Sequence, residues 1–65
     1  MNKTNTFKVG DRKQVAADYY DPSFQSRHVK IIALPSKEHP DEYLAEIEAG
    51  PLSGRRDWIL GSFLI

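Results

Sequence analysis

Hydrophobic and polar residues alternate along several short segments of the chain, a pattern typical of β-strands with one buried face. The alternation is most regular over residues 42–49, where Tyr43, Ala45 and Ile47 share the apolar side. A helix is the competing interpretation, because Ala, Glu and Leu are good helix formers. The segment is short and Gly50-Pro51 ends it, so the sequence favours a strand.

Three more segments alternate in the same way and predict three further strands. They cover residues 12–17, 28–34 and 55–60. Their inward residues are expected to be Val15, Ala17, Val29, Ile31, Ala33 and Ile59. Lys13 shares the inward parity of the first strand and fits there only at an open end of the fold, with its ammonium in water. Ile32 and Leu34 interrupt the polar side of the second strand.

The connections between these strands carry residues that favour turns. Gly10 is expected to take a positive φ, with Asp11 bonding the backbone of the same turn. Residues 18–27 make a long connection after the first strand, and long loops in a small domain are often functional. Residues 50–54 predict a hairpin loop, and Gly61-Ser62 a tight helical turn before a last short strand at residues 63–65.

The expected fold is all-β: a small barrel of about five short strands with a tight helical turn before the last strand. Residues 7–65 are expected to form this one domain, and the polar residues 1–6 a disordered tail. A chain of 65 residues without cysteine has no disulfide, so apolar packing must stabilise it. No apolar run approaches a membrane span, and residues 1–6 lack the hydrophobic segment of a signal peptide, which predicts a cytoplasmic protein.

The charges of the chain balance, with nine basic and nine acidic residues. Proteins that bind nucleic acid through phosphates usually carry a basic excess. Nucleic-acid binding therefore stays an alternative that depends on the basic residues gathering on one surface. The candidates for such a surface are Lys8, Arg12, Lys13, Arg27, Lys30, Arg55 and Arg56.

Two motifs resemble the SH3-like barrel superfold. Val9-Gly10-Asp11-Arg12 is similar to the start of its bacterial members, including KOW and Tudor-type modules, and residues 58–64 are similar to their last strand, helical turn and closing strand. The resemblance covers residues 7–65 and implies a barrel that binds its ligand between the first loop and the fourth strand. Residues 17–21 also resemble a segment of signalling SH3 domains, whereas Ser26-Arg27-His28 lacks the glycine of a KOW module.

The plasmid-type dihydrofolate reductases are another group of small barrels that the sequence resembles. The Gly10-Asp11-Arg12 start and the tyrosine and trailing Glu-Ala of residues 42–49 look like theirs. Their active site has a Val-Gln-Ile-Tyr run in the fourth strand, where this chain has Arg56-Asp57-Trp58-Ile59. An enzyme of that kind, assembled at a pore between protomers, is therefore the weaker alternative.

The candidate binding residues are aromatic and basic side chains near the first loop and the fourth strand. They are Tyr19, Tyr20, Phe24, Arg55, Arg56 and Trp58. Aromatic rings offer flat apolar faces to peptide prolines, stacked bases or a cationic side chain. Tyr19 and Trp58 are expected to be exposed, with Ile59 as the inward residue of the fourth strand. Tyr20 and Phe24 fit equally well as plugs at the ends of the barrel.

The two arginines and three outward apolar residues have open interpretations. Arg55 and Arg56 either grip a carboxylate or phosphate, or pair with glutamates of the neighbouring strand. The apolar residues either form a homo-oligomer contact or belong to a second part of the core. They are Ile32, Leu34 and Leu44.

Side chains suited to catalysis or metal binding are sparse. His28 and His39 belong to no recognisable ligand spacing, and Asp18 and Asp21 are expected to cap their own loop. No catalytic residue, metal site or cofactor is predicted. The sequence favours a non-enzymatic module that binds a protein partner through an aromatic-lined groove, as a small adaptor or inhibitor encoded by a bacterium, plasmid or phage.

Overall fold

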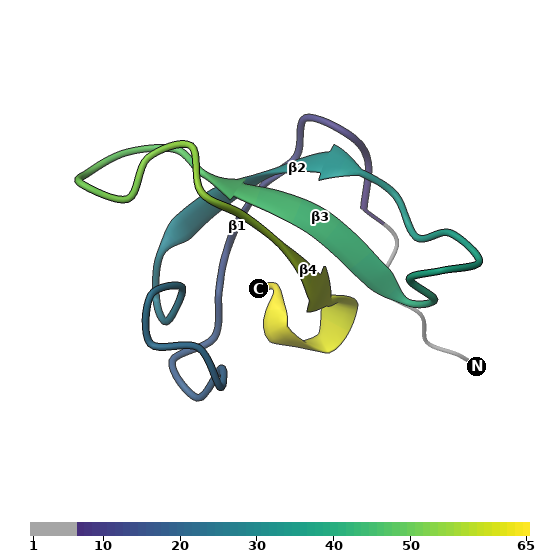
Figure 1. Cartoon of the computed structure of the whole chain (residues 1–65), viewed down its shortest axis with the longest axis horizontal. Helices are drawn as coiled ribbons and strands as arrows, with labels where there is room; N and C mark the ends of the chain where they lie inside the picture. The colour runs from purple at the N-terminus through teal and green to yellow at the C-terminus, as the bar shows by residue number, and fades with distance from the viewer. Residues whose placement is uncertain (1–6) are drawn as a thin grey trace.

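The computed structural model describes residues 7–65, which contain one antiparallel sheet in the order β1-β2-β3-β4 (Figure 1). The strands are β1 (Arg12–Gln14), β2 (His28–Ala33), β3 (Glu42–Ile47) and β4 (Arg56–Leu60), and a 3-10 helical turn, η1 (Gly61–Phe63), follows β4. The fold is all-β, as the alternating pattern predicts. Within residues 7–65, no helix is long and apolar enough to cross a membrane. The disordered tail predicted for residues 1–6 lies outside the described residues.

The apolar core packs against the inner face of the sheet, and β3 shows most clearly how the sequence builds it. Tyr43, Ala45 and Ile47 are buried and the residues between them are half-buried, so the strand is confirmed and the helix alternative is wrong. Burial of a large apolar side chain contributes about 1.5–3 kcal/mol. The buried hydrophobic residues are Val15, Tyr19, Phe24, Val29, Ile31, Tyr43, Ala45, Ile47, Ile59 and Leu64.

A β-bulge in β2 accounts for Ile32, and Leu34, the other apolar residue that interrupts the polar side of the pattern, lies just beyond the strand. Ile31 pairs with Ala45, but the next pair joins Ala33 to Leu44, so Ile32 is an extra residue. An extra residue shifts the parity of everything that follows it. Ala33 therefore shares the outer side with Leu44 and is half-buried, and the prediction that it points inward is wrong.

β1 is shorter than predicted, because the chain leaves the sheet soon after Gln14. Val15 is buried, as predicted, and forms an isolated bridge with Leu64. Ala17 lies in a turn and is exposed, so its predicted inward position is wrong. Lys13 keeps its charge out of the core by placing its ammonium 4.5 Å from the centre of the Phe7 ring, a cation–π contact.

Glycines with a positive φ form the two turns that the sequence predicts. Gly10 has a φ of 96°, and the Asp11 carboxylate accepts a hydrogen bond of 2.9 Å from the Lys8 amide in the same turn. Gly54 has a φ of 91° and donates a hydrogen bond of 2.8 Å to the Ile47 carbonyl, which closes the hairpin between β3 and β4. Both turn predictions are confirmed.

The segment after β4 curls back beneath the sheet and ends beside the continuation of β1 (Figure 1). The predicted helical turn is confirmed by η1. Gln14 and Ile65 exchange two backbone hydrogen bonds of 2.9 Å, and the Ala16 amide donates one of 2.8 Å to the Phe63 carbonyl. Leu64, between these bonds, is buried. The predicted last strand is therefore present only as this short contact, which forms an isolated bridge.

Candidate functional site

Tyr19 is a core residue, and the prediction that it is exposed is wrong. Its side chain is 1% exposed. The Tyr19 ring makes edge-to-face contacts with the rings of Phe24 and Phe63, at centroid-to-centroid distances of 6.4 and 5.1 Å. The Gln25 side chain also donates a hydrogen bond of 2.6 Å to the Tyr19 carbonyl, which fixes the loop around it. The first loop and η1 thus close over Tyr19 together.

Phe24 and Tyr20 differ from each other in exposure. Phe24 is buried, so it plugs the core, as one of its two interpretations proposes. Tyr20 is 74% exposed, and the centre of its ring lies 4.4 Å from that of Tyr19. Of the loop aromatics that the sequence singles out, Tyr20 is therefore the one that offers a ring face to solvent.

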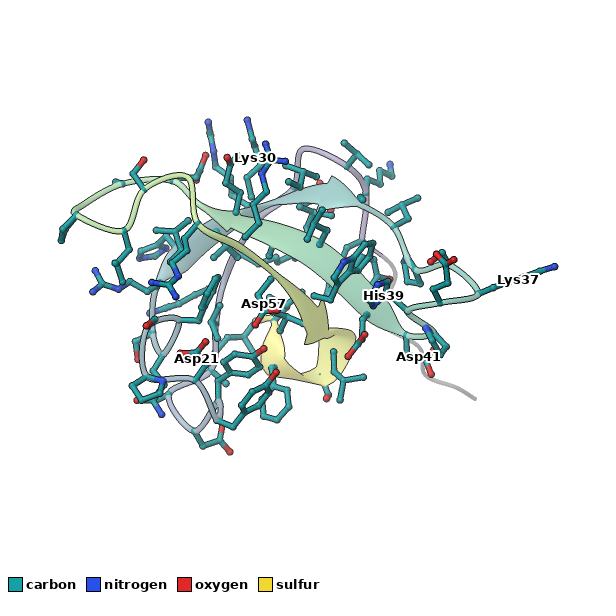
Figure 2. All side chains as sticks on the ribbon, in the orientation of Figure 1. Asp21, Lys30, Lys37, His39, Asp41 and Asp57 are labelled. Carbon is teal, nitrogen blue, oxygen red and sulfur yellow. The ribbon has the colours of Figure 1, made fainter. Side chains whose placement is uncertain are left out.

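Asp57 connects the buried Tyr19 to the backbone of β4. Its Oδ2 accepts a hydrogen bond of 3.3 Å from the Tyr19 hydroxyl, and its Oδ1 accepts one of 2.9 Å from the Trp58 amide. In Figure 2, Asp57 lies on the side of β4 toward η1, and His39 lies on the other side of the strand. Asp57 has the same parity along β4 as the buried Ile59, so the sequence places a carboxylate at an inward position of the strand. The sequence-based prediction of the site missed this signal.

Burial is the main reason why the pKa of Tyr19 lies far above its usual range, with a side-chain hydrogen bond to Tyr20 and the Asp57 charge adding to the effect. The folded state therefore keeps this phenol neutral at alkaline pH, whereas the unfolded chain ionises it above about pH 10. The stability that depends on the neutral phenol is complete below that pH. It is lost as the pH rises further, by up to about 1.4 kcal/mol per pH unit.

We expect the Tyr19→Phe variant to lose this component of the alkaline destabilisation. The measurement is the free energy of unfolding by urea at a series of pH values from neutral to strongly alkaline. Below about pH 9 the two proteins should differ by a constant free energy of unfolding, because the Tyr19 phenol is neutral there in both the folded and the unfolded state, and this range serves as the control. Equal slopes in the wild type and Tyr19→Phe would contradict the prediction.

Trp58 lies on the outer side of the sheet beside its strand partner Leu44, but it is half-buried, so the prediction that it is exposed is correct only in part. The His39 ring stacks on the Trp58 ring at a centroid distance of 4.0 Å and an interplanar angle of 3°. His39 Nδ1 also lies 3.1 Å from Glu42 Oε1. The sequence contains no signal for this stack, because it depends on how the loop before β3 folds back over β4.

The two arginines of the predicted site are adjacent, with Arg55 just before β4 and Arg56 as its first residue. Arg56 forms an ion pair of 3.5 Å with Glu46 of the neighbouring strand, which is the structural pairing that the sequence leaves open. Arg55 is exposed. Exposed ion pairs contribute about 0–1 kcal/mol, so Arg56 keeps most of its capacity to bind an anionic group.

The basic residues proposed for nucleic-acid binding are interspersed with other side chains. Arg12 forms an ion pair of 3.0 Å with Glu48, and Lys13 lies over a phenyl ring. The apolar residues proposed for a homo-oligomer are not equally accessible: Leu34 is 47% exposed, whereas Ile32 and Leu44 are half-buried. Nucleic-acid binding and homo-oligomer formation therefore both stay predictions.

Candidate metal ligands do not gather in the part of the chain that the structure describes. Among residues 7–65, no three His, Cys, Asp or Glu side chains lie together as metal ligands. The Asp21 carboxylate accepts a hydrogen bond of 2.9 Å from the Ser23 amide, so it caps its loop, as the sequence predicts.

Comparison with known proteins finds no matching family model, no similar curated protein and no similar solved structure. The function of the chain must therefore be inferred from the geometry of its own residues, in particular Tyr20, Asp57 and Trp58 around β4.

Proposed function

We propose that the chain is a non-enzymatic binding module that holds a protein partner across β4, with Tyr20 on one side of the strand and Trp58 on the other. The observation that supports this most is the pair of hydrogen bonds on Asp57, which fix the Tyr19 hydroxyl and the Trp58 backbone to one carboxylate. Tyr20 in turn rests against the Tyr19 ring. The exposed Tyr20 ring and the half-buried Trp58 ring are thus both connected to Asp57 through hydrogen bonds and ring contacts of the fold.

Rigid aromatic side chains suit protein recognition for a physical reason. They bury a large area on binding while losing little conformational entropy, and they dominate the energetics of many interfaces. Arg56 has the same outward parity as Trp58 on β4 and adds a charged rim. A protein partner fits the balanced charge of the chain better than a polyanion does.

The fold that we propose for this module is the SH3-like barrel, with residues 63–65 as the fifth strand that closes it. The backbone bonds between Gln14 and Ile65 and from Ala16 to Phe63 support closure at this point. The superfold implies ligand binding between the first loop and the fourth strand, which is where Tyr20 and Trp58 flank β4. A small adaptor or inhibitor is the role that such a single module fits.

Selection from a library of random peptides displayed on phage tests the proposal without a known partner. We expect peptides to be enriched on the wild type, and the Tyr20→Ala and Trp58→Ala variants each to bind them at least about tenfold more weakly. The matched control is Val9→Ala, which truncates another exposed hydrophobic residue, in the turn before β1, at the opposite edge of the sheet. All variants should retain the circular dichroism spectrum of the wild type.

Two results would contradict the proposed function. One is the absence of any peptide enriched above the background of the library. The other is a set of enriched peptides whose affinity is unchanged in the Tyr20→Ala and Trp58→Ala variants, because they would bind another surface of the chain.

A further inference from the structure

The accessible face of Trp58 is partly covered by a residue of the chain itself. The loop between β2 and β3 carries His39 onto the indole, and the two rings are parallel to within 3°. The imidazole is not sealed in, because its side chain remains 35% exposed. A partner that stacks on this face of Trp58 must therefore displace His39.

Backbone hydrogen bonds hold the loop in place both before and after His39 in the sequence. Ser36 and His39 exchange two backbone hydrogen bonds of 3.2 Å, so the residues before the histidine form a closed turn. On the other side, the Asp41 carbonyl accepts a hydrogen bond of 3.1 Å from the Gly61 amide, and Asp41 has a φ of 63°. These bonds hold the backbone of the loop and do not involve the His39 side chain, so displacement of the imidazole breaks none of them.

Glu42 makes the strength of this cover depend on a proton. Its Oε1 lies 3.1 Å from His39 Nδ1, so an imidazolium would form an ion pair there while it lies over the indole. A cation over tryptophan is the strongest of the aromatic–cation pairs. A neutral imidazole retains the ring stack, and it retains the hydrogen bond to Glu42 in the tautomer that carries the proton on Nδ1, but it loses both charge interactions.

We propose that His39 is a proton-controlled cover of the Trp58 face, closed at mildly acidic pH and displaced more easily at alkaline pH. The regulatory consequence rests on the proposed function: a partner that needs Trp58 binds more weakly as the pH falls. Histidine is the side chain suited to this role, because imidazole gains its proton between about pH 5 and 8.

The charged groups around the cover are few. Glu42 of β3 is the acidic group in contact with the ring. On β4, Arg56 is paired with Glu46, and Asp57 is bonded to Tyr19. The loop that carries His39 also contains Lys37, Glu38 and Asp41. Substitution of His39 and Glu42 therefore separates the cover from the background titration of the loop.

The chain contains a single tryptophan, so its fluorescence reports on the cover directly. Quenching by acrylamide measures how accessible Trp58 is, and it needs no partner. We expect the quenching constant of the wild type to be about two- to fivefold lower at about pH 5.5 than at about pH 8. The His39→Gln variant should show equal constants at the two pH values. The Glu42→Gln variant should be more accessible than the wild type at the lower pH.

The other histidine of the chain supplies the matched control. His28 lies exposed on β2, and the His28→Gln variant should retain the full pH dependence of quenching. The cover would be refuted if His39→Gln kept the wild-type dependence, or if His28→Gln abolished it. Circular dichroism at both pH values confirms that each variant is folded.

A second measurement tests the consequence for binding with a peptide selected on the wild type. We expect its affinity to be about two- to fivefold weaker at about pH 5.5 than at about pH 8, and equal at both in His39→Gln. If no peptide is enriched, the proposed function fails while the quenching experiment still decides whether the cover exists. Equal affinity at both pH values in the wild type would overturn the regulatory consequence alone.

Discussion

Replacing Tyr19 with alanine is expected to destabilise the domain by about 3–5 kcal/mol, which approaches the whole stability of a chain of this size. The substitution removes a fully buried ring from between Phe24 and Phe63. It also leaves Asp57 Oδ2 without its phenol donor. Thermal or urea unfolding followed by circular dichroism measures the effect, and we expect little folded protein near physiological temperature.

Two further variants separate the causes of that loss. Tyr19→Phe keeps the ring and removes only the hydroxyl, so it should cost about 0.5–1.5 kcal/mol. Tyr20→Ala removes the neighbouring exposed ring and should change stability by less than about 1 kcal/mol. A stable Tyr19→Ala variant would mean that the ring is not the centre of the core, and the support for the Tyr20 surface would fail with it.

The sequence predicts those parts of the fold that obey a simple period. In β3, Tyr43, Ala45 and Ile47 alternate without interruption, and the partner strands bury them as the period requires. Ile59 is the inward residue of β4 for the same reason. The turns at Gly10 and Gly54 are predictable because a positive φ is available to glycine at little cost.

The candidate site is less predictable, because it depends on contacts between distant segments. Residues in a loop do not alternate between a buried and an exposed face, so the sequence does not show which of two adjacent tyrosines is buried. The side chains of other segments that pack against the loop decide this. Asp57 supplies a hydrogen-bond acceptor to Tyr19, and Phe63 supplies a ring beside it. Both come from the far end of the sequence, so the local pattern around Tyr19 and Tyr20 does not contain the answer.

Parity arguments also fail where a strand is irregular. The bulge at Ile32 reverses the faces of the residues after it, which moves Ala33 to the outer side with Leu44. Leu44 in turn pairs with Trp58 of β4, so Ala33, Leu44 and Trp58 lie next to one another across the outer side of three strands. The bulge therefore contributes to the surface around the indole. Ile32 and Leu34 appear in the sequence as a broken pattern, and that break marks an irregularity in the strand.

Removing residues 63–65 is expected to prevent the domain from folding. The shortened protein lacks the buried Leu64 side chain, which contributes about 2–5 kcal/mol to stability. It also lacks three backbone hydrogen bonds to Gln14 and Ala16, which contribute about 0.5–1.5 kcal/mol each. Leu64→Ala should be intermediate, whereas Ile65→Ala should have little effect, because that side chain is 72% exposed and its backbone bonds remain. A cooperative unfolding transition in the shortened chain would show that this contact is dispensable, and closure by a fifth strand would have to be abandoned.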